Sequence, residues 1–198
     1  APAQLPYLIM GFKTPTMGTL DDPADAYALE VLASILDGGE SARLTRNLLR
    51  GKQIAASAGA SYNMYKPQES MFIFDGTPLP QTDIKDLEQA ILDEIEAIKK
   101  HGVEEAELAR VKAQVMANDV FEKDSMFYKA ISIGSLETLG FGYQVMDAYL
   151  QGIESVTAEQ VQAVAQKYLV ESGLTVGIVK PQAAGQAALV DDNGADKE

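Results

Sequence analysis

Residues that could carry out catalysis are few in this sequence. The chain has 198 residues, with a single histidine, His101, and no cysteine. A hydrolytic zinc site usually takes three protein ligands, which one histidine without cysteine cannot supply in the usual way. A Ser–His–Asp triad would also need His101, which stands at the end of an expected helix, where the helix dipole favours a positive charge. We therefore predict no catalytic residue and no metal ligand in this chain.

Charge and motif content exclude further classes of protein. The net charge of −13 argues against a nucleic-acid partner, because phosphate binding needs clustered Lys and Arg. No apolar run reaches the roughly 18 residues of a membrane span. Neither a dinucleotide fingerprint nor a Walker motif occurs. Acidic pairs such as Glu104-Glu105 stand at expected helix starts, where solvated carboxylates are the rule.

The elements that would position functional residues follow from apolar periodicity and from helix stop signals. A strand is followed by two helices, two strands joined by a short loop, a run of helices and a last strand. This order predicts a two-layer α/β sandwich of the α+β class, with helices on one face of a mixed, mostly antiparallel sheet. The expected strands are 6–12, 54–62, 70–76 and 174–179, and the expected helices are 22–36, 41–50, 82–101, 104–123, 125–139, 141–152 and 157–170.

The second strand is built from small residues that alternate between its two sides. Alternation assigns Ala56, Ala58 and Tyr62 to one side and Ala55 and Ser57 to the other. One face of the sheet is therefore expected to meet solvent, substrate or a partner.

Residues 1–181 are predicted to form a single domain, and residues 182–198 a flexible tail. The tail is rich in Ala, Gly, Gln and Asp and lacks periodicity. The start, Ala-Pro-Ala-Gln, lacks an initiator methionine and a signal-peptide pattern. We interpret the chain as an excised fragment or a processed product.

One stretch, residues 36–58, carries a more specific signal. It reads Leu-Asp-Gly-Gly-Glu-Ser-Ala-Arg-Leu-Thr-Arg-Asn-Leu-Leu-Arg-Gly-Lys-Gln-Ile-Ala-Ala-Ser-Ala: a helix stop, a short helix ending in Leu-Arg, then a small-residue strand. Here the chain resembles the C-terminal, non-catalytic half-module of the pitrilysin/insulinase family, which includes mitochondrial processing peptidase. The resemblance extends over about residues 4–181, and it implies the LuxS/mitochondrial processing peptidase-like metallohydrolase fold.

The resemblance also implies a function. Family members consist of two similar halves that face each other; the N-terminal half carries the inverted zinc motif His-x-x-Glu-His, so zinc is expected in that partner half and no cofactor in this chain. The C-terminal half supplies an Arg and a Tyr to an extended peptide substrate near the scissile bond. The arginine falls on Arg50. The tyrosine position falls on Ser57, a departure from the family pattern, and Tyr62 is assigned to the opposite side of the strand.

Three functions remain open at this stage. The chain is expected to be the substrate-binding half of a zinc-dependent peptidase, with Arg50 and Ser57 as substrate-binding residues and inactive by itself. A structural or assembly subunit of the same fold is the alternative, which the serine at position 57 favours. A peptide-binding module that acts alone is a third. Because bacterial relatives are often exported, the resemblance favours a periplasmic location.

Overall fold

Four antiparallel strands form the sheet of the computed structural model, in the order β2-β3-β1-β4. The structure describes residues 5–181, so the predicted tail at 182–198 lies outside the described residues. All three strand pairings are antiparallel, including the predicted β2–β3 hairpin. The strands are β1 (Tyr7–Thr14), β2 (Ala55–Ser61), β3 (Ser70–Pro78) and β4 (Leu174–Val179).

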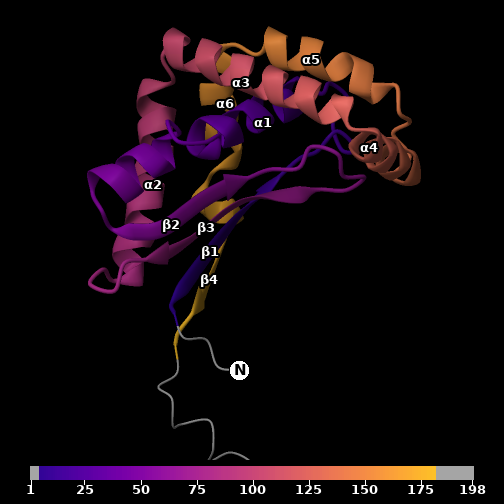
Figure 1. Ribbon diagram of the computed structural model, residues 1–198. Helices are drawn as coiled ribbons and strands as arrows, with labels where there is room; N and C mark the ends of the chain where they lie inside the picture. Colours follow the sequence, from indigo (N-terminus) through magenta and orange to yellow (C-terminus); the bar gives the residue numbers. More distant parts are fainter. Residues whose placement is uncertain (1–4, 182–198) are drawn as a thin grey trace, which may run out of the picture.

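The helices cover one face of this sheet, as the sequence predicts (Figure 1). Helix α1 lies directly on the sheet, and most of its residues are buried. None of the described helices is long and apolar enough to cross a membrane. The helices are α1 (Ala24–Asp37), η1 (Thr45–Gly51), α2 (Ile84–His101), α3 (Glu105–Asp124), α4 (Met126–Thr138), α5 (Val145–Ser155), α6 (Ala158–Tyr168) and η2 (Glu171–Gly173).

The core lies between the sheet and α1. Alternate residues of β1 and β3 point toward the helices, among them Phe12, Phe72 and Phe74, which are fully buried. The rings of Phe12 and Phe74 meet edge to face, with centroids 5.9 Å apart. Side chains of the opposite parity, such as Ile9 and Met71, stay partly exposed on the face that the helices leave open.

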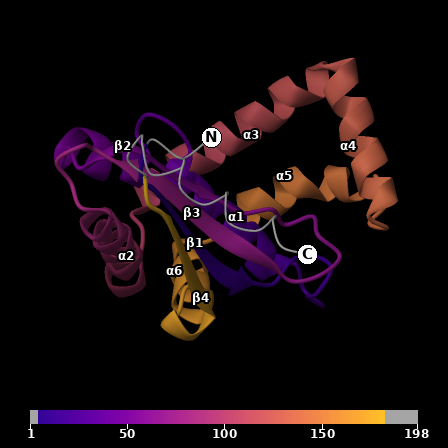
Figure 2. The ribbon, with the colours of Figure 1, turned by 90° about the horizontal axis from the view of Figure 1, so that it is seen from below.

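Helices α3, α4 and α5 form an arm that reaches past the end of the sheet. Figure 2 shows α3 running outward, α4 turning at the far end and α5 returning. The loop of the β2–β3 hairpin approaches the arm, where the rings of Tyr65 and Phe141 lie 6.2 Å apart. The outer part of the arm carries exposed apolar side chains, including Phe121, Met126 and Phe127.

Two local details differ from the sequence prediction. The short helix after α1 is wound mainly as a π-helix. At its end the Lys52 N–H donates to the carbonyl of Asn47, five residues back, and not to that of Leu48, four residues back. The Leu48 carbonyl accepts from the Ile54 N–H. In β2, a β-bulge leaves Ala56 as an extra residue between two pairs of the ladder. The bulge places Ala55 in the core and Ala56 in solvent, so the predicted sides of these two residues were wrong.

Candidate functional site

Arg50 lies in the last turn of η1, where its side chain reaches solvent. Its guanidinium forms an ion pair with the Glu40 carboxylate, and the two side chains are 59% and 84% exposed. An ion pair between exposed side chains is worth about 1 kcal/mol or less. Glu40 therefore steadies Arg50 without preventing it from binding another carboxylate or a carbonyl group.

Ser57 lies on β2, an edge strand, and its side chain is exposed. Between Arg50 and Ser57 the chain passes through Gln53, whose φ of +52° is in the left-handed region. Such a conformation costs a non-glycine residue about 1 kcal/mol or more. The structure thus places both predicted substrate-binding residues on adjoining exposed elements. No hydrogen bond joins them within the described part of the chain.

Tyr62 cannot take the place of the tyrosine that the family pattern expects at position 57. Its side chain is buried, its ring stacks on Phe72 with centroids 6.1 Å apart, and its hydroxyl donates to the Pro15 carbonyl at 2.7 Å. Burial raises the pKa of the phenol. Tyr62 therefore holds the β2–β3 loop against the chain that follows β1.

The outer edge of β2 offers main-chain groups for pairing. The N–H of Ala60 points away from β3, because it donates to Asp37 Oδ2 at 3.2 Å. Alternate residues of an antiparallel strand direct their main-chain groups to the same edge, so Ala58 also presents its N–H and C=O outward. Burial raises the pKa of Asp37, which the hydrogen bond from Ala60 opposes. Asp37 thus covers the Ala60 position of the outer edge of β2.

The basic side of the short helix is divided between structural and solvent-exposed residues. Arg43 forms a nearly buried ion pair with Glu107 of α3, at 2.6 Å between Nη2 and Oε2. Arg46 is exposed and donates only to its neighbour Asn47. Of the three arginines of this segment, Arg43 therefore holds the helix in place, whereas Arg46 and Arg50 face solvent.

No metal site is found among residues 5–181, where no three His, Asp or Glu side chains converge. His101 is exposed in the last turn of α2, next to Lys99 and Lys100, as the helix dipole favours.

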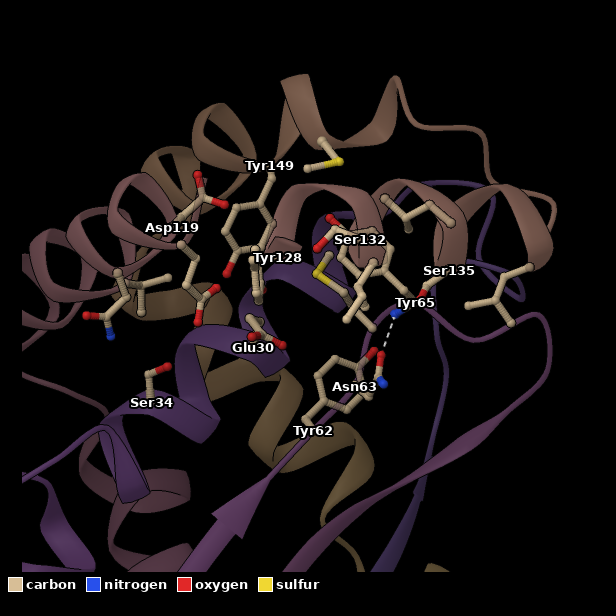
Figure 3. Close-up of a pocket in the computed structure, with 18 residues that line it drawn as sticks. Glu30, Ser34, Tyr62, Asn63, Tyr65, Asp119, Tyr128, Ser132, Ser135 and Tyr149 are labelled. Atoms are coloured by element: carbon tan, nitrogen blue, oxygen red, sulfur yellow. Dashed lines mark hydrogen bonds between the residues drawn. The ribbon is translucent and has the colours of Figure 1, made fainter. Parts of the chain in front are cut away.

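A cavity under the arm was not anticipated from the sequence. It has a volume of about 560 Å³ and lies between α1, the β2–β3 loop and the three helices of the arm. Glu30 of α1 lines it together with Asp119 and Glu122 of α3 and several tyrosines (Figure 3). The only sequence signal was an acidic residue within an otherwise apolar stretch of a helix.

Comparison with known proteins decides the family. The sequence profile described as the peptidase M16 inactive domain matches residues 1–115, more than half of the chain. The chain belongs to the peptidase M16 family as its inactive domain. This confirms the resemblance drawn from residues 36–58.

Relatives of this M16 inactive domain include the uncharacterized zinc protease YmxG of Bacillus subtilis, 25% identical over 165 residues. That match covers 83% of this chain and 39% of YmxG, so the chain spans about two fifths of such a relative. A protease from Helicobacter pylori has the same fold, with a TM-score of 0.81 and 22% identity over 90% of this chain and 42% of that one. An inactive peptidase domain from Bordetella parapertussis superposes with a TM-score of 0.79 at 18% identity, covering 93% of this chain and 97% of that domain.

Proposed function

We propose that this M16 inactive domain is the substrate-holding half of a zinc peptidase. It would close the reaction chamber and hold an extended peptide against a zinc-bearing half, on the same parent chain or on a separate subunit. The observation that carries the proposal is that Arg50 and Ser57 are both exposed, Arg50 on η1 and Ser57 on the edge strand β2, and that these two elements contact each other. Family membership supports it, because its relatives include proteins named zinc proteases.

The metal would be held elsewhere. The chain spans about two fifths of YmxG, and no metal-binding cluster occurs among the described residues. A zinc ion in the partner half would supply the activated water. The residues of this chain would bind and orient the peptide, which places the scissile bond in a reactive geometry.

The peptide would bind as an added strand along β2. Ala58 would form main-chain hydrogen bonds, as in other cases of strand addition to a sheet edge. Arg50 would donate to a substrate carbonyl, and the Ser57 hydroxyl would donate or accept with shorter reach than a tyrosine. A strand that continues past Ala60 would replace the carboxylate of Asp37 on its N–H.

Exposed apolar side chains support a large partner. Met126 is 88% and Phe127 76% exposed on the arm, and Ile9 and Met71 are partly exposed on the open face of the sheet. A contiguous exposed apolar patch usually marks an interaction site. Three fifths of YmxG lies outside the matched region, which is enough chain to form the zinc-bearing half.

A binding titration tests the role of Arg50. A fluorescently labelled unfolded peptide is titrated with the chain, with its Arg50→Ala variant and with Arg46→Ala, and anisotropy is measured. Arg46 is the matched control, since it is an exposed arginine of the same helix. We expect Arg50→Ala to weaken binding about tenfold, the usual loss for a hydrogen bond from a charged donor, and Arg46→Ala to leave it unchanged. Equal binding by all three proteins would remove Arg50 from the site.

A second assay separates the two halves. We expect the chain alone to bind no stoichiometric zinc and to leave peptides intact. One tightly bound zinc per chain, together with peptidase activity, would refute the proposal that zinc and catalysis belong to the partner half.

A structural or assembly subunit of the same fold is the second candidate. Ser57 stands where the family pattern has a tyrosine, and the guanidinium of Arg50 already has a partner in Glu40. An upstream His-x-x-Glu-His in the parent chain, or in a co-purifying subunit, would favour the peptidase. Absence of this motif from the parent chain and from every co-purifying subunit would favour the structural or assembly subunit.

A further inference from the structure

We propose that the cavity under the α3–α4–α5 arm is a binding site for an organic cation, an ammonium or guanidinium group on an aliphatic chain. The site is separate from the β2 edge, and the proposal does not depend on zinc, on peptide cleavage or on Arg50.

The cavity has the size and construction of a ligand site. Its volume of about 560 Å³ falls within the usual range for small-molecule pockets, roughly 300 to 1,000 Å³. Helix α1 forms the floor, and the helices of the arm form the roof (Figure 3). Its walls combine apolar side chains such as Ile131 and Met146 with acidic and phenolic ones.

Glu30 is the central acidic group of the cavity. Its side chain is half-buried, and it lines the cavity from α1. No hydrogen bond or ion pair to Glu30 is present within the described part of the chain. Burial raises the pKa of Glu30 to about 7. A carboxylate that is partly withdrawn from water without a partner is costly to ionise, and a cation in the cavity would offset that cost.

Two further carboxylates make the cavity acidic. Asp119 and Glu122 line it from α3, and no Lys, Arg or His of residues 5–181 lines it. Lys123 lies 2.8 Å from Asp119 Oδ2 and neutralises part of this charge from outside the lining. Glu30 and Glu122 remain without a basic partner among the described residues, so the cavity attracts a positive charge and repels an anion.

Tyrosine rings supply the second element of a cation site. Tyr65, Tyr128 and Tyr149 line the same cavity, and Figure 3 shows Tyr128 and Tyr149 extending from the roof toward Glu30. Burial, followed by the nearby charge of Glu30, raises the pKa of Tyr149, so the phenol stays neutral. Neutral phenol rings bind ammonium and guanidinium groups over their faces, and their hydroxyls share hydrogen bonds with a carboxylate. This favours an organic cation over a metal ion, which would need converging oxygen ligands.

Calorimetric titration of the whole chain at about pH 8 tests the proposal, because Glu30 is then ionised. The probes are acetyl-arginine methylamide, its neutral analogue acetyl-citrulline methylamide, and agmatine. The proteins are the unchanged chain, Glu30→Gln, and Glu154→Gln as a control. Glu154 is exposed on α5, the helix that carries Tyr149, and does not line the cavity.

We expect saturable binding of the two cations at one site per chain. Citrulline in place of arginine, and Glu30→Gln, should each weaken binding about tenfold or more, while Glu154→Gln stays within about twofold. Tighter binding of agmatine would identify a free small-molecule cation as the ligand, and tighter binding of the arginine compound would identify a polypeptide side chain. The proposal would be overturned if Glu30→Gln bound the cations as tightly as the unchanged chain, or if the citrulline and arginine compounds bound equally. It would also be overturned if neither cation showed saturable binding.

Discussion

Replacing Glu30 by glutamine should stabilise the fold at alkaline pH and not at acid pH. Burial raises the pKa of Glu30 from its ordinary 4.5 to about 7 in the folded chain. Each pKa unit corresponds to about 1.4 kcal/mol, so ionising Glu30 in the folded state costs about 3 kcal/mol more than in the unfolded chain. Glutamine has almost the same shape and carries no charge, and the partly open cavity leaves room to hydrate its amide.

The sign of the effect follows from which state loses its proton first. Below about pH 4.5 both states hold the proton, and Glu30 has no effect on stability. As the pH rises from about 4.5 to about 7, the unfolded chain is ionised and the folded chain is not, so the free energy of unfolding falls. Above about pH 7 the full cost is present. Asp119 and Glu122 face the same cavity, but they are common to both proteins and largely cancel in the difference.

Urea unfolding followed by circular dichroism measures this difference. At about pH 8, Glu30→Gln should raise the free energy of unfolding by about 3 kcal/mol; at about pH 5 the gain should be below about 1 kcal/mol. Glu154→Gln removes the same charge from an exposed position. It should change the free energy of unfolding by less than about 0.5 kcal/mol at both pH values. An equal gain at both pH values, or a loss at the higher one, would show that Glu30 is not an isolated buried carboxylate.

Three further substitutions test how the helices are held. Arg43→Ala should lower the free energy of unfolding by about 3 kcal/mol, because it leaves Glu107 charged in a site where its side chain is only 10% exposed; urea unfolding measures this. Gly152→Ala should lower stability by about 1 to 3 kcal/mol, because a Cβ there would overlap the ring of Tyr27, and the melting temperature should fall. Gly134→Ala is its matched opposite: Gly134 is helical, and no atom beyond its own stretch of helix lies within 4 Å of the new methyl group, so stability should rise by about 0.5 to 1 kcal/mol. A loss on Gly134→Ala would show that α4 is not helical at that position in solution.

The fold was predictable from sequence because its signals are local. The Thr157 capping box marks the start of α6, and the glycine after His101 marks the end of α2. The β-bulge at Ala56 was not predictable in this way. In a strand of small residues either side can face the core, and pairing with Thr77 and Pro78 of β3 decides which one does.

The candidate site was predictable in part for the same reason. Arg50 is exposed at the end of its helix, as a basic residue after an apolar run suggests, although its role and that of Ser57 stay predictions. The position of Glu30 could not be foreseen. Its burial depends on helices that follow 75 or more residues later and fold back over α1. Residues brought together by such a return leave no trace in local periodicity.

The π-helical winding of η1 makes the direction of Arg50 sensitive to chain length. Removal of one residue between Thr45 and Leu49 would turn every later position of the helix by roughly a quarter of a turn around its axis. A homologue with one residue fewer in this segment could keep the letters Leu-Arg-x-Lys and still direct its arginine to another side of the helix. When homologues are compared for substrate binding, the number of residues between the Gly-Gly turn at 38–39 and this arginine is therefore as informative as the arginine itself.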